Sequence, residues 1–191
     1  MFAESRPLAD NSPMSNRLPS HLQLSMSATA DPAAVVSAAN VRFTVLTPRV
    51  IRLEYSPNDA FEDRPSQPFW YRQQPIPQFT QREESGLLTI ETDALTLAYR
   101  ISEAGFTADT LQIFGESFSW RYGQTNTDNL LGTYRTLDGI SGNTPLEQGL
   151  LATDGWAVIN DSKTLVFNQE SWLEPRPQDN LDLYFFGYGS N

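Results

Sequence analysis

Short segments in which apolar and polar residues alternate recur along this chain, and they constrain the fold more than any other feature. Residues 41–45 are VRFTV and residues 51–55 are IRLEY, so each segment carries apolar side chains on one face. A period of two residues predicts a half-buried β-strand, whereas an amphipathic helix repeats about every 3.6 residues. Further segments that predict strands lie at 87–91, 95–101, 111–114, 118–122 and 181–186.

The connections between these segments complete the prediction of an all-β fold. Residues 156–159 and 164–167 flank the polar sequence NDSK, which predicts a β-hairpin. Residues 56–86 contain five prolines and predict a long irregular connection, anchored to the sandwich by the aromatic side chains of 69–71. No segment has a helical period beyond a turn or two. Many short strands without alternating helices indicate a β-sandwich.

The N-terminal region differs in composition from the remainder of the chain. Residues 1–34 contain six serines and four prolines, with few large apolar side chains, and predict a disordered tail. Residues 35–191 then form one domain. The tail lacks the basic start and continuous apolar stretch of a secretory signal. Together with the absence of cysteine, this leads us to expect a cytoplasmic protein.

The charge of the chain argues against nucleic acid as a partner. Thirteen basic and 23 acidic residues give a formal net charge of −10. Such a field repels phosphate backbones and anionic membranes, and no stretch approaches the roughly 18 apolar residues of a membrane-spanning helix. A neutral ligand such as a sugar is not disfavoured.

Several catalytic and metal-binding chemistries are excluded by composition. The chain has no cysteine and a single histidine, His21, so disulfides, thiol catalysis, cysteine-ligated zinc and histidine-rich metal sites are impossible. We therefore expect neither a metal nor a cofactor.

The densest motif in the sequence occupies two neighbouring segments. Residues 129–139 are NLLGTYRTLDG, and residues 146–162 are LEQGLLATDGWAVINDS. These runs resemble the N-terminal region of bacterial glycoside hydrolase family 31 enzymes, which include α-glucosidases and α-xylosidases. The segments TPRVIRLEY at 47–55, EDRPS at 62–66 and YFFGYG at 184–189 are similar to the same family.

The resemblance implies an N-terminal sandwich of the galactose-mutarotase-like type, which in the family packs on a (β/α)8 barrel. The family's two catalytic aspartates lie on that barrel, which takes about 250 residues and is expected beyond residue 191. No catalytic residue can therefore be carried over to this chain. The resemblance implies an accessory domain, inactive alone, that helps to shape a pocket for an α-linked glucoside or xyloside.

Four residues of the motif are candidates for contact with that sugar. Asp138 and Asp154 could accept hydrogen bonds from sugar hydroxyls, with Arg135 as a charged donor or orienting partner. The alternative is an Arg–Asp pair that only fixes the loop. Trp156 could stack on a sugar ring, but its place at the start of a predicted strand favours core packing.

Independent catalysis would need a different arrangement of carboxylates. A retaining glycosidase holds two carboxyl groups about 5–5.5 Å apart. Asp138, Glu147, Asp154 and Asp161 are close enough in sequence to be candidates, although Asp before Gly and Asn-Asp are typical of turns.

Two other classes of function stay open. The chain could be a stand-alone carbohydrate-binding sandwich or a non-enzymatic interaction domain. Because Tyr184, Phe185, Phe186 and Tyr188 lie where the family's chain enters the barrel, we expect them to form an exposed patch that promotes self-association.

Overall fold

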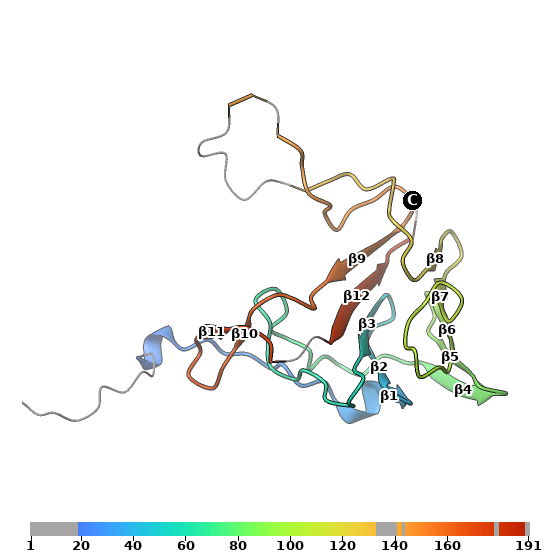
Figure 1. Cartoon of the computed structure of the whole chain (residues 1–191), viewed down its shortest axis with the longest axis horizontal. Helices are drawn as coiled ribbons and strands as arrows, with labels where there is room; N and C mark the ends of the chain where they lie inside the picture. The colour runs from blue at the N-terminus through green and yellow to red at the C-terminus, as the bar shows by residue number, and fades with distance from the viewer. Residues whose placement is uncertain (1–18, 133–140, 143, 178–179, 190–191) are drawn as a thin grey trace, which may run out of the picture.

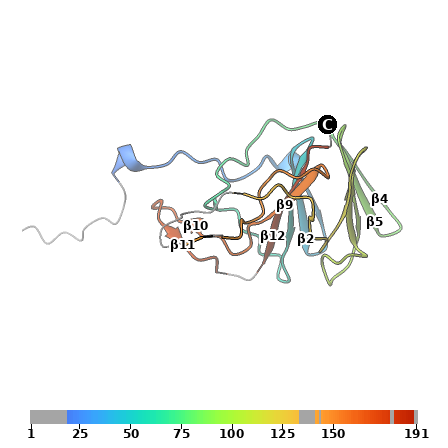
Figure 2. The same cartoon turned by 90° about the horizontal axis from the view of Figure 1, so that it is seen from above.

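The chain folds into an antiparallel β-sandwich, which confirms the predicted all-β class. A computed structural model describes residues 19–132, 141–142, 144–177 and 180–189. Two five-stranded sheets face one another (Figures 1 and 2). In the described residues the helical segments are two single 3-10 turns, η1 (Ser20–Leu22) and η2 (Pro32–Ala34). None of the described segments is a helix of the length and apolar character needed to cross a membrane.

The first sheet has a strand order that departs from the order of the sequence. Its strands, in spatial order, are β1 (Val35–Ala38), β2 (Val41–Thr47), β3 (Val50–Tyr55), β12 (Leu181–Gly187) and β9 (Trp156–Asn160). β12 lies between β3 and β9 and pairs antiparallel with both, so that Leu183 lies opposite Leu53 on one side and Asn160 on the other.

The second sheet is a simple meander. Its strands are β4 (Thr80–Glu84), β5 (Leu87–Glu91), β6 (Thr96–Arg100), β7 (Leu111–Phe114) and β8 (Ser119–Arg121). A two-stranded ribbon of β10 (Val166–Phe167) and β11 (Leu173–Glu174) stands apart from both sheets.

The apolar positions that the alternation predicts form the core between the sheets. Phe43, Ile51 and Leu53 of the first sheet and Leu97 and Ile113 of the second are fully buried. Aromatic rings close one end of this core: the ring centroids of Trp120, Trp156 and Phe185 lie within 6.4 Å of one another.

The predicted hairpin between 156–159 and 164–167 is wrong. β9 pairs with β12, and the second segment leaves the sheet to pair with β11. The physical reason lies at Asp161, which is fully buried: its backbone N–H donates to Asp182 O and its carboxylate binds Arg176. These contacts turn the chain away from β9.

The outer face of the first sheet is covered by irregular segments, although the alternation predicts a polar face exposed to solvent. Arg52 and Glu54 each expose only 2% of their surface. The connection after β3 covers them, with Phe69 stacked on Tyr184 at 3.5 Å between ring centroids. The irregular connection is shorter than the predicted 56–86, because β4 (Thr80–Glu84) forms within that range. Phe69 and Trp70 pack on other aromatic rings, whereas Tyr71 is exposed.

The described part of the predicted tail also contacts this layer. Ser27 forms an isolated bridge with Tyr71, and Arg72 donates through Nη1 to Ala28 O. The extent of the tail stays a prediction.

Candidate functional site

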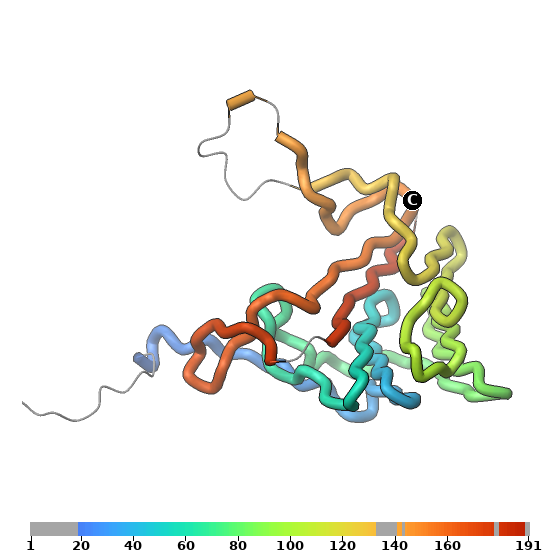
Figure 3. The backbone as a smooth tube through the Cα atoms, in the orientation of Figure 1, coloured from blue at the N-terminus to red at the C-terminus, as the bar shows by residue number. Residues whose placement is uncertain are grey.

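The described residues between β8 and β9, which include parts of both motif segments, form a protruding arm (Figures 1 and 3). We define the arm as the described residues 126–132, 141–142 and 144–155. Its two sides run antiparallel: Asn129 and Ala152 form a bridge, and Leu130 N–H donates to Leu151 O at 2.8 Å. Arg135 and Asp138, two of the predicted sugar contacts, lie outside the described residues.

Asn129 holds the two sides of the arm together through its carboxamide. Its Oδ1 accepts hydrogen bonds from Leu131 N–H at 2.8 Å and from Gly149 N–H at 2.9 Å, while its Nδ2 donates to Gly149 O at 2.8 Å. A Cβ at Gly149 would lie 3.2 Å from Leu131 O and 3.3 Å from Gly132 Cα. The close approach of the two sides therefore favours glycine at this position.

The arm presents leucine side chains to solvent. Five of them expose between 46% and 64% of their surface, namely Leu130, Leu131, Leu146, Leu150 and Leu151. Singly exposed leucines are common on protein surfaces, but a group of them on one protruding element is typical of an interaction site. The arm is therefore the best candidate for a surface that binds another protein domain.

The base of the arm is fixed by polar contacts that include Asp154. Asn126 Nδ2 donates to Asp154 Oδ1 at 3.1 Å and to Trp156 O at 2.7 Å. Asp154 is half-buried. Among the described residues, Asn126 is the one that donates a hydrogen bond to the Asp154 carboxylate. Asp154 is thus oriented without being neutralised by a described cation, and its carboxylate keeps the capacity to accept hydrogen bonds.

Trp156 lies in the core and not on a ligand-binding surface. It exposes 3% of its surface and packs against Trp120 and Phe185. This arrangement matches the core-packing alternative from the sequence.

The prediction of an exposed aromatic patch at 184–188 is wrong. Tyr184 and Phe185 expose none of their surface, because β12 lies in the middle of its sheet and both of its faces are covered. Tyr188 is half-buried, and its hydroxyl accepts a hydrogen bond from Ala152 N–H at 2.6 Å. It therefore anchors the base of the arm.

The structure keeps two of the candidate carboxylates, Asp154 and Asp161, apart, while Asp138 lies outside the described residues. Asp154 and Asp161 lie beyond opposite ends of β9, and a strand of this length spans about 16 Å. Asp161 is buried and bound by Arg176 at 2.6 Å, and burial raises its pKa. Within the described ranges no three His, Cys, Asp or Glu side chains are grouped as metal ligands would be.

Sequence reasoning missed the buried ion network on the outer face of the first sheet. Arg52 binds Asp182 through two hydrogen bonds of 2.7 and 2.8 Å, and it lies 3.0 Å from Glu54. Burial opposes ionisation of Asp182, but Arg52 outweighs it and lowers the pKa of Asp182. The charged residues of the two strand segments, Arg52 and Glu54 in 51–55 and Asp182 in 181–186, were the available signal.

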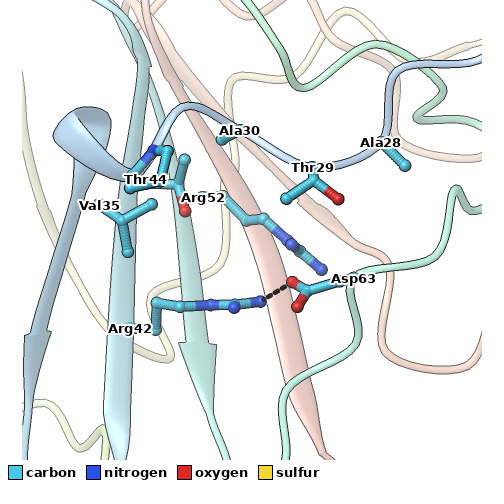
Figure 4. Close-up of a pocket in the computed structure, with 9 residues that line it drawn as sticks. Ala28, Thr29, Ala30, Val35, Arg42, Thr44, Arg52 and Asp63 are labelled. Atoms are coloured by element: carbon cyan, nitrogen blue, oxygen red, sulfur yellow. Dashed lines mark hydrogen bonds and ion pairs between the residues drawn. The ribbon is translucent and has the colours of Figure 1, made fainter.

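A cavity of about 270 Å³ adjoins this network, as Figure 4 shows. Arg42 and Arg52 reach into it, but both are already committed: Arg42 Nη2 binds Asp63 at 2.7 Å, and Arg52 binds Asp182. The cavity therefore offers a ligand no unpaired cation among its described lining residues.

The described residues define an antiparallel β-sandwich with an apolar arm at one end. No family model and no curated protein matches the chain. Solved structures that match include two of the Flavobacterium johnsoniae GH31 dextranase, a mutant complexed with isomaltotriose and a complex with glucose. They are 16% and 15% identical to this chain, with TM-scores of 0.47 and 0.44. Each match covers 80% of this chain and 24% of the dextranase chain, so this chain spans about a quarter of their length.

Proposed function

We propose that this chain is the N-terminal accessory domain of an α-glycoside hydrolase of family 31, with a sandwich of the galactose-mutarotase-like type. In this proposal the arm docks against a catalytic (β/α)8 barrel and helps to shape a pocket for an α-linked glucoside or xyloside. The sequence motifs at 129–139 and 146–162 support it.

The observation that carries the proposal is the exposure of leucines on the element that contains the motif. Full burial of one leucine contributes about 1.5–3 kcal/mol, so docking of several would stabilise an interface. The contacts of Asn129 and Tyr188 hold the arm in place before it meets a partner, which lowers the entropy lost on binding.

Asp154 is the described residue best placed to contact the sugar in such a complex. It lies at the base of the arm, half-buried and oriented by Asn126. A carboxylate accepts hydrogen bonds from vicinal hydroxyls, and such charge-assisted bonds are stronger than neutral ones.

The experiment is binding of the chain to a separately produced family 31 barrel that lacks its own sandwich. We expect association by analytical ultracentrifugation, weakened at least about tenfold by the double change Leu130→Ser and Leu150→Ser, which removes two exposed leucines that the proposed interface would bury. Leu87→Ser is the matched control, because Leu87 is an exposed leucine on β5, in the other sheet. Association that is unaffected by the arm variant, or no association, would overturn the proposal.

A further inference from the structure

A second cleft lies at the end of the sandwich opposite the arm. It has a volume of about 350 Å³, and its lining includes Tyr55, Phe106, Tyr122, Asn160, Lys163 and Asn180. The strand register places it: Tyr55 lies opposite Leu181 at the start of β12, whereas Gly187 at the end of β12 lies opposite Trp156, next to the arm. The cleft is therefore separate from the site proposed above.

One wall of the cleft is a row of aromatic rings. The centroid of Phe106 lies 6.5 Å from that of Tyr55 and 5.9 Å from that of Tyr122. Phe106 is buried, while the two tyrosines are half-buried. Gly105 has φ of +71°, and a Cβ there would lie 2.4 Å from the Tyr55 ring. Glycine at 105 thus allows the ring of Tyr55 to lie against the backbone and form this wall.

The remaining lining supplies hydrogen-bond donors that have no partner in the described chain. Asn160 is exposed; its Oδ1 accepts from Ser162 N–H at 3.0 Å, which orients the side chain, but no described residue accepts from its Nδ2. Lys163 is also exposed and forms no ion pair with a described residue. It is the single lysine of the sequence. Arg42 and Arg52, by contrast, are paired with described carboxylates.

We infer that this cleft binds a neutral sugar ring. An aromatic wall with a few oriented polar groups is typical of small-ligand sites, and the cleft is large enough for one ring. The apolar face of the sugar would pack on Tyr55 and Tyr122, while Asn160 Nδ2 and Lys163 Nζ donate to its hydroxyl groups. The net charge of −10, and the presence of Lys163 as the one cation in the described lining, disfavour an anionic ligand.

This inference goes beyond the proposed function, because it concerns a sugar held by the isolated chain without a barrel. Failure of the arm to bind a barrel would leave it intact. Likewise, an empty cleft would not affect the docking of the arm.

The single lysine permits a direct test on the full chain. An amine-specific reagent modifies Lys163 and the N-terminal amine, and mass spectrometry separates the two products. We expect maltotriose or isomaltotriose at millimolar concentration to slow modification of Lys163 and to leave the N-terminal amine, an internal reference, unchanged. Equal rates at Lys163 with and without either sugar would overturn the inference.

Calorimetric titration with the same sugars tests the other contacts. We expect Tyr122→Ala and Asn160→Ala each to weaken binding roughly fivefold to tenfold. The matched control is Tyr71→Ala, which removes an exposed tyrosine outside the cleft. Because Tyr122 is half-buried, Lys163→Gln provides a second variant at an exposed position, with folding checked by circular dichroism. Sugar binding that survives all three cleft variants would contradict the inference. So would a labelling experiment in which a peptide, and neither sugar, protects Lys163.

Discussion

Arg52 and Asp182 are separated by 130 positions in the sequence, yet their side chains form a two-point ion pair in the covered face of the first sheet. Arg52 Nε lies 2.8 Å from Oδ1 and Nη2 lies 2.7 Å from Oδ2. Each side chain exposes only 2% of its surface. Arg176 also binds Asp182, at 2.9 Å, so one carboxylate joins a central strand to the layer of irregular segments that covers it.

Removal of one partner of this pair should destabilise the fold strongly. Arg52→Leu leaves Asp182 with Arg176 as its remaining described salt-bridge partner, and leaves Glu54 with Arg42 alone. Breaking a buried ion pair typically costs about 3–5 kcal/mol, which urea denaturation would measure as a lower free energy of unfolding. Arg82→Leu is the control, since the exposed Arg82–Glu84 pair should contribute less than about 1 kcal/mol. Equal stability of the two variants would contradict the structural role of Arg52.

Tyr184 should make the protein sensitive to alkali. Burial, opposed by Arg52, raises the pKa of Tyr184 to about 12, whereas an unfolded tyrosine titrates near 10. Between about pH 10 and 12 the unfolded state loses its proton first, so the free energy of unfolding falls as pH rises, by roughly 2 kcal/mol. Thermal unfolding across this range should show the loss.

Tyr184→Phe is the variant that tests this assignment. It should lower stability at neutral pH, because Arg72 Nε loses a hydrogen bond of 2.6 Å to the Tyr184 hydroxyl. It should also reduce the fall in the free energy of unfolding as the pH rises through the alkaline range. An unchanged slope would assign the titration to another group, such as Tyr99, whose pKa is also raised by burial.

The isolated chain should self-associate through the arm. Exposed leucines favour association, and at about 0.15 M salt the repulsion between net negative charges extends only roughly 8 Å. Sedimentation over a salt series should therefore show association that increases with salt. Changing Leu131, Leu150 and Leu151 to serine should give a monomer at every salt concentration, and persistent association of that variant would assign the interface elsewhere.

Asp154→Ala in a family 31 enzyme that carries the same arm should impair catalysis more than folding. A charge-assisted hydrogen bond to a sugar contributes about 1.5–3 kcal/mol, or roughly tenfold to more than a hundredfold in kcat/KM. Asn126→Ala is the comparison, because it removes the hydrogen bond between Asn126 and Asp154 but keeps the Asp154 carboxylate. A lower melting temperature with normal kinetics in the folded fraction would indicate that Asp154 only fixes the arm. Asp138→Ala, outside the described residues, belongs in the same series.

The isolated chain should not hydrolyse aryl α-glucosides or α-xylosides. Asp154 and Asp161 lie beyond opposite ends of β9, and the carboxylate of Asp161 is already paired with Arg176. Release of nitrophenol would measure turnover. Activity that persists through purification and disappears in Asp154→Asn would contradict this expectation.

The sequence predicts the strands whose two faces differ in polarity and fails where they do not. Phe43 and Leu53 mark inward faces that the structure buries, whereas β4 has the sequence TQREE, exposed at all five positions, and gives no signal. Alternation also cannot distinguish a polar face in water from one under another layer. Arg52 and Glu54 illustrate this, because they are covered by the irregular connection after β3, and Arg52 pairs with Asp182, which is distant in sequence.

Errors of pairing have a similar cause. The polar turn after Asn160 favours a local hairpin, but Asp161 is held by Arg176 and by Asp182 O. The terminal aromatic residues suggested an exposed patch because their strand neighbours were unknown. The exposed leucines of the arm had a signal in the sequence, since the pairs at 130–131 and 150–151 lack the alternation of a strand.

The position of β12 sets the order in which the polypeptide can fold as it leaves the ribosome. β3 and β9 cannot complete the first sheet until the segment between them, Leu181–Gly187, has been synthesised. Until then their inner edges carry unpaired backbone groups, which promote aggregation. The meander of β4–β8, formed by neighbours in sequence, is free to assemble earlier. A nascent chain halted before residue 181 would hold one finished sheet and one open sheet, a form that chaperones bind and proteases cleave.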